Sequence, residues 1–207
     1  MFWLFALISL VGGYLLGSVS AAVMLTRHQR LGDVRKQGSG NAGATNVARV
    51  YGIWVGLLTL LGDGIKTALA MWLGRLLAGE PGAIIAAFGC LMGHCFPLYF
   101  GFKGGKAVSV SGAIGLFLDW RFFLILVAVF LLAALLTKRV SVGSMAAAVA
   151  YPLGMLALGG FPWYALALGV FITLFVIFMH RENVKRLLKG TEPAFTLGKG
   201  GKDKSGK

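Results

Sequence analysis

The chain has 207 residues, 57% of them hydrophobic and only 13% charged, with 20 Lys and Arg against 7 Asp and Glu. Soluble domains carry about 25% charged residues, so this composition excludes an ordinary soluble fold. The mean hydropathy of +0.81 points to a lipid environment. The net charge is +13, and strongly basic proteins often bind nucleic acid. Here, however, the basic residues lie between apolar runs and are not gathered on one soluble domain. We therefore predict an integral membrane protein that binds no nucleic acid.

The uncharged segments predict seven transmembrane helices in an all-α bundle. The first covers residues 2–25; a signal peptide is the competing interpretation, but its start should be basic and residues 1–26 carry no charge. The second, 51–79, is interrupted at Gly62-Asp63-Gly64, which predicts a kinked span or two short helices. The remaining candidates are residues 82–100, 107–118, 121–137, 143–158 and 162–179.

The segment 107–118 is too short to cross a membrane alone. Its 12 residues make a helix of about 18 Å, whereas the hydrocarbon core is roughly 30 Å thick. We expect a half-spanning helix, or a preceding loop that dips into the membrane.

The distribution of basic residues predicts the orientation. With the N-terminus outside and the C-terminus in the cytoplasm, 17 of the 20 Lys and Arg lie on the inner side, as the positive-inside rule requires. We expect one transmembrane domain, residues 1–192, and a disordered basic tail, residues 193–207. The two cysteines, Cys90 and Cys95, lie in an apolar stretch without C-x-x-C spacing, so neither a disulfide framework nor a metal site is predicted.

The first of three polar clusters on the predicted inner face is a glycine-rich segment. Its sequence is Gly38-Ser39-Gly40-Asn41-Ala42-Gly43-Ala44-Thr45-Asn46, followed by Arg49. Alternating glycines let consecutive N–H groups turn toward one anion, and a helix that starts near Thr45 or Asn46 adds positive potential. A flexible connector fits the same composition equally well. The spacing is not that of a nucleotide-binding P-loop.

The second cluster joins the end of one predicted span to the short segment. It runs Gly93-His94-Cys95-Phe96-Pro97 and then Phe102-Lys103-Gly104-Gly105-Lys106. Lysine suits phosphate as a flexible point charge, and paired glycines allow close approach of a ligand to the backbone. The alternative is that both lysines are membrane-surface anchors. For His94 a structural role at a helix end is favoured over a ligand-binding role.

The third cluster, His180-Arg181-Glu182-Asn183, lies at the inner end of the last span. His180 and Asn183 share a helix face that we expect to point into the bundle. The neighbouring basic residues are expected to be surface anchors. Ser141 and Ser144 lie at the same level and are expected to combine helix capping with phosphate binding.

Together the clusters predict a site for an anionic, phosphorylated substrate at the inner membrane surface. Carboxylates are scarce there, so Mg²⁺-dependent phosphoryl transfer is disfavoured. A transporter or channel for an anionic solute or lysolipid is the competing class, because broken helices, such as the one expected at Gly62-Asp63-Gly64, and short segments also occur at transport sites. No inverted repeat supports it.

At these clusters the chain resembles the bacterial glycerol-3-phosphate acyltransferases that use acyl phosphate as donor, the PlsY-like membrane family. The first motif matches Gly38-Ser39-Gly40-Asn41-x-Gly43-Ala44-Thr45-Asn46-x-x-Arg49. The second matches Gly93-His94-x-x-Pro97 through Phe102-Lys103-Gly104-Gly105-Lys106, and the third matches His180-Arg181-Glu182-Asn183 with Arg186-Leu187. One departure is Ala107-Val108-Ser109, where the family usually has Gly-Val-Ala-Thr.

The resemblance implies transfer of a fatty acyl group from acyl phosphate to the 1-hydroxyl of glycerol 3-phosphate. The products would be lysophosphatidic acid and inorganic phosphate, in the first acylation of phospholipid synthesis. The implied partners are these two substrates and membrane lipid; no metal, other cofactor or obligatory protein partner is implied. The implied location is the bacterial inner membrane, with the site facing the cytoplasm. Because an acyl phosphate is already activated, positioning and electrostatics can suffice without a protein nucleophile.

The motifs assign two sets of site residues. The expected catalytic residues are Ser39, Arg49, Lys106, His180 and Asn183. The expected substrate- and phosphate-binding residues are Gly38, Gly40, Asn41, Gly43, Thr45, Asn46, Lys103, Gly104, Gly105, Ser141 and Ser144.

Overall fold

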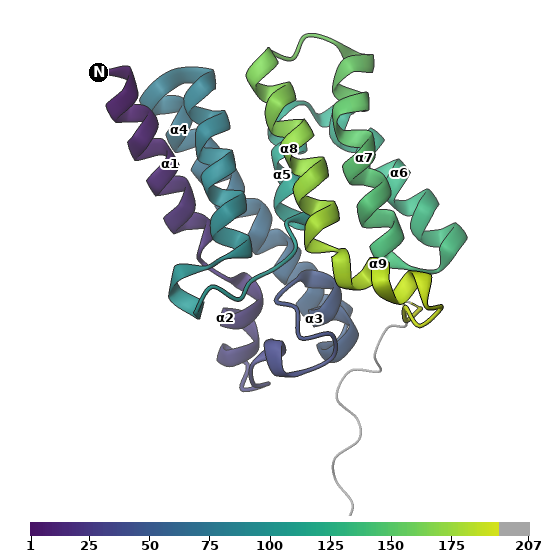
Figure 1. Cartoon of the computed structure of the whole chain (residues 1–207). Coiled ribbons are helices and arrows are strands. Elements are labelled where there is room, and N and C mark those ends of the chain that lie inside the picture. Colours follow the sequence, from purple (N-terminus) through teal and green to yellow (C-terminus); the bar gives the residue numbers. More distant parts are fainter. Residues whose placement is uncertain (195–207) are drawn as a thin grey trace, which may run out of the picture.

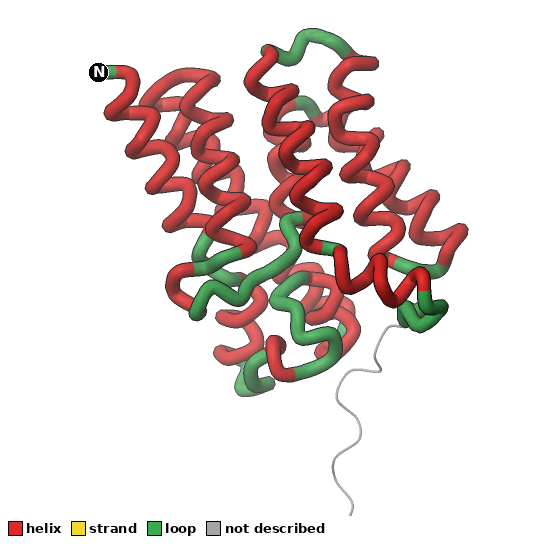
Figure 2. The backbone as a smooth tube through the Cα atoms, in the orientation of Figure 1, coloured by secondary structure: helices red, strands yellow, loops and turns green. Residues whose placement is uncertain are grey.

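The computed structural model describes residues 1–194, and the regular secondary structure of this part of the chain is entirely helical (Figures 1 and 2). The α-helices are α1 (Phe2–Gly17), α2 (Ala21–His28), α3 (Ala44–Tyr51), α4 (Ile53–Cys95), α5 (Val108–Leu118), α6 (Trp120–Thr137), α7 (Val140–Leu158), α8 (Trp163–Met179) and α9 (Arg181–Leu188). Two short 3₁₀ turns, η1 (Val34–Lys36) and η2 (Leu98–Phe100), lie in the loops. Apart from residues 193 and 194, the predicted tail lies outside the described residues, and the boundary at residue 192 stays a prediction.

Several helices are suited to a lipid environment. Four helical segments are long and apolar enough to cross a membrane: Phe2–His28, Ile53–Phe100, Trp120–Thr137 and Val140–Leu158. The pair α8 and α9 is a fifth candidate, although it bends by 56°. Trp120 and Trp163, at the first turns of α6 and α8, are 63% and 79% exposed, as is common for tryptophan at a membrane–water interface. The chain is therefore an all-helical membrane protein.

The second predicted span is not interrupted where the sequence indicated. Helix α4 runs through Gly62, Asp63 and Gly64 without a break, and its only non-helical residues are Ala78 and Gly79. There Gly79 adopts a φ of +65°, and the chain folds back into a helical hairpin. The expected kink at Gly62–Gly64 was therefore wrong, because an isolated glycine remains compatible with a helix.

The first predicted span is divided in two. Helix α1 ends at Gly17, and Ser20 caps the start of α2, where its hydroxyl accepts a hydrogen bond from the Val23 N–H at 3.4 Å. The short segment, by contrast, agrees with expectation: α5 has only 11 residues.

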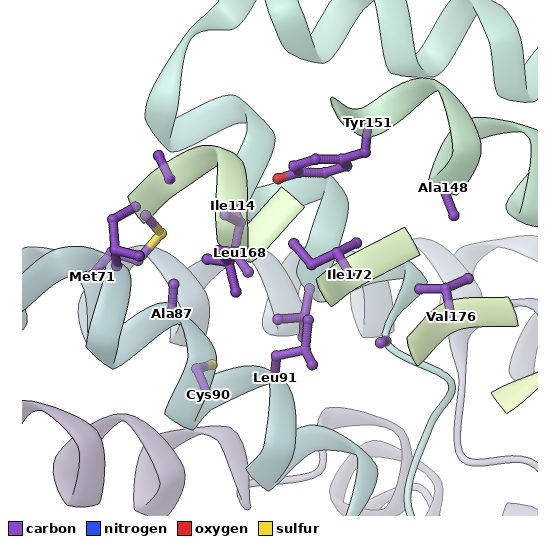
Figure 3. Close-up of a cluster of buried hydrophobic side chains, with 14 of the residues drawn as sticks. Met71, Ala87, Cys90, Leu91, Ile114, Ala148, Tyr151, Leu168, Ile172 and Val176 are labelled. Carbon is purple, nitrogen blue, oxygen red and sulfur yellow. The ribbon is translucent and has the colours of Figure 1, made fainter. Parts of the chain in front are cut away.

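The core lies where α4, α5, α7 and α8 meet (Figure 3). Tyr151 of α7 points into this cluster, and its ring meets Phe122 of α6 edge to face, with ring centroids 4.8 Å apart. Glycines bring α1 against α4: a Cβ on Gly13 would lie 2.3 Å from the Ala86 carbonyl oxygen. Close backbone contact is the usual way in which membrane helices associate.

This packing gathers the polar elements at one end of the bundle. Helices α2, α3 and α9 and the longest loops lie at the end opposite the N-terminus (Figures 1 and 2). The three polar clusters of the sequence are all found there.

Candidate active site

The glycine-rich segment is a folded loop that the side chain of Asn46 organises. Asn46 lies on α3 and is buried. Its Oδ1 accepts a hydrogen bond from the Ser39 N–H at 2.9 Å, and its Nδ2 donates to the carbonyls of Gln37 and Asn41, both at 3.0 Å. With all these partners, Asn46 shapes the loop and is not free to bind a ligand.

Two glycines of this loop are required by its conformation. Gly38 and Gly40 have φ values of +59° and +72°, in the left-handed region that favours glycine. A Cβ on Gly38 would also lie 2.3 Å from Asn46 Oδ1. Helix α3 begins at Ala44, close to the predicted start, so Thr45 lies in its first turn. Ser39 is exposed at the loop surface.

Asp33 and Arg35, which the sequence motifs did not indicate, connect this loop to the second cluster. The carboxylate of Asp33 receives hydrogen bonds from Arg35 Nε at 3.0 Å and Nη2 at 2.7 Å. These bonds lower the pKa of Asp33 and raise that of Arg35. Arg35 Nη1 then donates to the carbonyl of Phe100. Arg35 thus connects η1 to η2, and the two bonded residues are 65 positions apart in the sequence.

The turn before α5 packs tightly on the end of α4. The N–H groups of Gly104 and Gly105 donate to the carbonyls of Cys95 and His94, each at 3.1 Å. These two N–H groups are therefore already occupied, and the glycines serve close packing: a Cβ on Gly104 would lie 2.0 Å from the His94 oxygen. Lys103 is exposed.

Ala107, which follows Lys106, is held in an unfavourable conformation. Its φ is +69° and its ψ is −10°, although it carries a Cβ. The left-handed region costs such a residue roughly 1–2 kcal/mol. The chain therefore has alanine at a position where the backbone conformation favours glycine, the residue that the family usually has there.

Lys106 meets the third cluster directly. Its Nζ donates a hydrogen bond to Oδ1 of Asn183, on α9. Nδ2 of Asn183 donates in turn to Oε1 of Glu192 at 2.7 Å, and the same oxygen accepts from Ser141 Oγ at 2.6 Å. Oε2 of Glu192 pairs with Arg186 Nε at 2.8 Å. One carboxylate thus connects α7, α9 and, through Asn183, the Lys106 turn.

The site is strongly positive. Burial lowers the pKa of Lys106, and the positive charges of Arg186, Arg181 and Arg49 lower it further, while Glu192 acts in the opposite direction. Nε of Arg49 is buried without a hydrogen-bond partner among the described residues. A buried, unpaired guanidinium N–H is costly unless an anion binds it.

The remaining predicted residues lie beside this cluster. Nδ1 of His180 donates to the Val176 carbonyl at 2.8 Å, and the ring is buried. Ser144 donates to the Val140 carbonyl at 3.0 Å. The predicted capping role of Ser141 and Ser144 was wrong: the residue before α7 is Arg139, no side chain caps the helix, and both serines lie within its first turns.

Comparisons with known proteins identify the family. The sequence profile of the glycerol-3-phosphate acyltransferase family matches residues 7–190. A glycerol-3-phosphate acyltransferase of Syntrophomonas wolfei is 42% identical over 183 residues, covering 88% of this chain and 93% of the relative. That of a Synechococcus strain is 45% identical over 194 residues, with 92% and 94% coverage. The chain belongs to the PlsY-type glycerol-3-phosphate acyltransferase family.

Solved structures of the family agree with the fold. The crystal structure of PlsY, an integral membrane glycerol 3-phosphate acyltransferase, in its glycerol 3-phosphate form matches with a TM-score of 0.86 and 31% identity, covering 92% of this chain and 96% of that one. Its lysophosphatidic acid form matches with a TM-score of 0.84 and 30% identity. Membership confirms the resemblance seen in the motifs and makes the chain a membrane acyltransferase of phospholipid synthesis. The family match also decides against the transporter alternative.

Glu192 is the main site residue that the family motifs did not supply. It is 8% exposed and closes the hydrogen-bond network described above. The sequence held one signal: an acid within a strongly basic segment, in a chain with only 7 acidic residues. Its partners, however, are distant in sequence, since Ser141 lies 51 positions away.

Proposed function

We propose that this enzyme transfers a fatty acyl group from acyl phosphate to the 1-hydroxyl of glycerol 3-phosphate. The products are lysophosphatidic acid and inorganic phosphate. The observation that carries this proposal is the contact between Lys106 and Asn183, near the charge of Arg49, whose buried Nε has no hydrogen-bond partner among the described residues. Two cationic side chains are thereby available at one place to bind phosphate, and Asn183 positions one of them. The substrate and product forms of the PlsY crystal structures support the two glycerol compounds.

In this mechanism the protein positions two substrates and stabilises charge. The glycerol hydroxyl oxygen forms a bond to the acyl carbon, the acyl carbon–oxygen bond to phosphate breaks, and a phosphate oxygen takes the hydroxyl proton. Lys106 and Arg49 offset the negative charge that develops on the phosphate. Because Nδ1 of His180 donates to Val176, the neutral ring offers Nε2 as an acceptor that orients the hydroxyl. Ser39, Thr45 and Ser144 are proposed to contact the phosphates.

An apolar groove offers a place for the acyl chain. It has a volume of about 360 Å³ and is lined by Leu10, Ile84, Ile85, Phe88, Ala167, Leu168 and Phe171. Aromatic contacts continue from Phe88 through Phe171 and Phe175 to Phe96, next to the loop that leads to Lys106. The groove therefore supports a membrane-dissolved acyl donor whose phosphate reaches the polar end.

We also propose the topology that the charges predict. The two halves of α4 count as separate crossings, and α1, α6, α7 and α8 add four. The short α5 completes the seventh together with the loop that precedes it. The N-terminus lies outside, and the active site faces the cytoplasm of a bacterial cell.

The donor is tested with purified protein in lipid. We expect lysophosphatidic acid from acyl phosphate and glycerol 3-phosphate, in the presence of a chelator and without added Mg²⁺. Activity only with acyl-CoA or acyl-carrier protein would overturn the donor assignment. A requirement for divalent cations would overturn the metal-free mechanism.

The roles of the two cations are tested by Arg49→Ala and Lys106→Ala. Each should lower the rate well over ~10-fold, because losing one partner of a desolvated charge pair costs about 2–5 kcal/mol. Arg30→Ala and Lys189→Ala, which change exposed basic residues of the same end, serve as controls and should keep the rate within about twofold. Near-normal rates in Arg49→Ala and Lys106→Ala would assign both side chains to surface anchoring.

A further inference from the structure

A group of buried ionisable side chains lies next to the proposed site but outside it. Asp63, Lys66 and His94 are 1%, 6% and 5% exposed. Lys66 Nζ pairs with Asp63 Oδ1 at 2.9 Å and lies 3.2 Å from His94 Nδ1. Ionisable groups within a membrane bundle are costly and usually functional, yet the mechanism above uses none of these three.

The group is connected to both sides of the turn that carries Lys106. After Lys106, the Ser109 hydroxyl donates to Asp63 Oδ2 at 2.6 Å. Before it, Gly105 lies against the His94 ring, where a Cβ would be 2.1 Å from Nε2, and its N–H donates to the His94 carbonyl. The residues on both sides of Lys106 are thus connected to the buried group: Ser109 to Asp63, and Gly105 to His94.

The turn needs such attachments because its backbone is unfavourable. Ala107 has a φ of +69° and is completely buried, and a residue with a Cβ leaves the left-handed region unless its surroundings hold it there. The hydrogen bond from Ser109 is charge-assisted and short, as the stronger hydrogen bonds are. It lies two residues beyond Ala107, where it opposes relaxation of the turn.

Lys66 anchors the group to a third element. Its Nζ also donates to the carbonyls of Gly17 at 3.1 Å and Val19 at 2.8 Å, at the break between α1 and α2. These carbonyls have lost their helical partners at the break, so an ammonium group satisfies them. The ion pair is therefore also attached to the junction of α1 and α2, and this third attachment helps to hold the strained turn.

We propose that Asp63, Lys66, His94 and Ser109 form a positioning network that holds the Lys106 turn in its binding geometry. These residues do not contact substrate; they act through Lys106. The inference rests on the proposed role of Lys106 in binding phosphate. That role is checked separately, by finding which substrate has its KM raised in Lys106→Ala.

The test is the KM for each substrate in Ser109→Ala. We expect the KM to rise about tenfold, the usual effect of losing a charge-assisted hydrogen bond, for the same substrate whose KM Lys106→Ala raises. The KM for the other substrate should stay within twofold. Ser111→Ala is the matched control on the same helix, because the Ser111 hydroxyl has no partner among the described residues.

Rescue distinguishes positioning from general stability. Adding Ala107→Gly to Ser109→Ala removes the strain that the hydrogen bond opposes and should restore most of the lost affinity. Ser109→Thr and Ser109→Val, which have the same shape and differ in the hydroxyl, give a second comparison if Ser109→Ala folds poorly. The Ser109→Thr variant should have the KM of the parent protein, and the Ser109→Val variant should have a raised KM.

Three results would overturn the proposal. They are an unchanged KM in both Ser109→Ala and Ser109→Val, an equal rise in KM for both substrates, and a loss of thermal stability with unchanged KM in the folded fraction. If Lys106→Ala changes neither KM, the role of Lys106 itself is wrong, and that result is distinct from a failure of the network alone.

Discussion

Asn183 joins the two halves of the site, because its amide has one acceptor end and one donor end. Oδ1 accepts from Lys106, so Nδ2 faces Glu192, and the carboxylate of Glu192 also accepts from Ser141 and Arg186. Burial alone would raise the pKa of Glu192, but these three hydrogen bonds outweigh it and lower that pKa. Glu192 therefore stays charged at neutral pH and fixes the direction of the amide.

Replacing this carboxylate by an amide tests that arrangement. Glu192→Gln puts an N–H₂ group where an oxygen now accepts, so at least one of the donors loses its partner. We expect kcat/KM to fall about 10- to 100-fold, since a hydrogen bond to a charged group contributes about 1.5–3 kcal/mol. Glu182→Gln is the control, because Glu182 is exposed on α9 and pairs only with Lys185 among the described residues. Equal activity of the two variants would show that Glu192 does not orient Asn183.

The lowered pKa of Lys106 predicts a limit at alkaline pH. Burial is the main cause, followed by nearby Arg186. A lysine with a lowered pKa loses its proton, and with it its attraction for phosphate, at a lower pH than an exposed lysine. The KM for the phosphate substrate that we propose Lys106 to bind should therefore rise as pH increases through this lowered pKa. Lys106→Arg keeps its charge over the same range and should remove the rise, which steady-state kinetics from pH 6 to about 10 can measure.

At the scale of elements, close helix contacts hold the site end of the bundle. Gly13 of α1 touches the backbone of α4, where a Cβ would lie 2.3 Å from the Ala86 oxygen, whereas a Cβ on neighbouring Gly12 would meet nothing within 4 Å. Gly13→Ala should force the helices apart and destabilise the protein by about 1–3 kcal/mol. Gly12→Ala should be neutral or slightly stabilising. Thermal unfolding in detergent compares the two, and equal melting temperatures would contradict the packing argument.

The sequence predicted apolar helices well and backbone breaks poorly. The short α5 follows directly from the length of its uncharged run. The break after α1 and the continuity of α4 at Gly62–Gly64 do not, because tertiary contacts decide them: Lys66, from α4, satisfies the carbonyls freed at Gly17 and Val19.

For the site, too, the sequence indicated some features of the structure and not others. The motifs named Lys106 and Asn183, which meet in the structure. They also assigned ligand binding to Asn46 and Gly104, but the side-chain amide of Asn46 and the N–H of Gly104 form hydrogen bonds within the protein. A residue type shows what a side chain can bind, whereas the folded neighbours decide which of its groups remain free.

At the scale of the whole molecule, the basic residues and the polar elements are concentrated at the same end of the bundle. Helices α2, α3 and α9 and the loop before α5 lie at one end of the bundle, and the N-terminus lies at the other (Figure 1). Most of the 20 basic residues therefore belong to the end that holds the site. A concentration of positive charge attracts anionic substrates and also favours the proposed placement of this end in the cytoplasm.

The orientation can be measured with a membrane-impermeant thiol reagent on intact cells. Both native cysteines are buried, with Cys90 at 0% and Cys95 at 2% exposure, so the background is low. Cysteines introduced by Glu80→Cys and Trp163→Cys, at exposed positions of the end opposite the site, should be labelled in intact cells. Those introduced by Lys36→Cys and Lys189→Cys, exposed at the site end, should be labelled only after the membrane is permeabilised. The reverse pattern would place the site outside the cell, and the proposed cytoplasmic active site would be wrong.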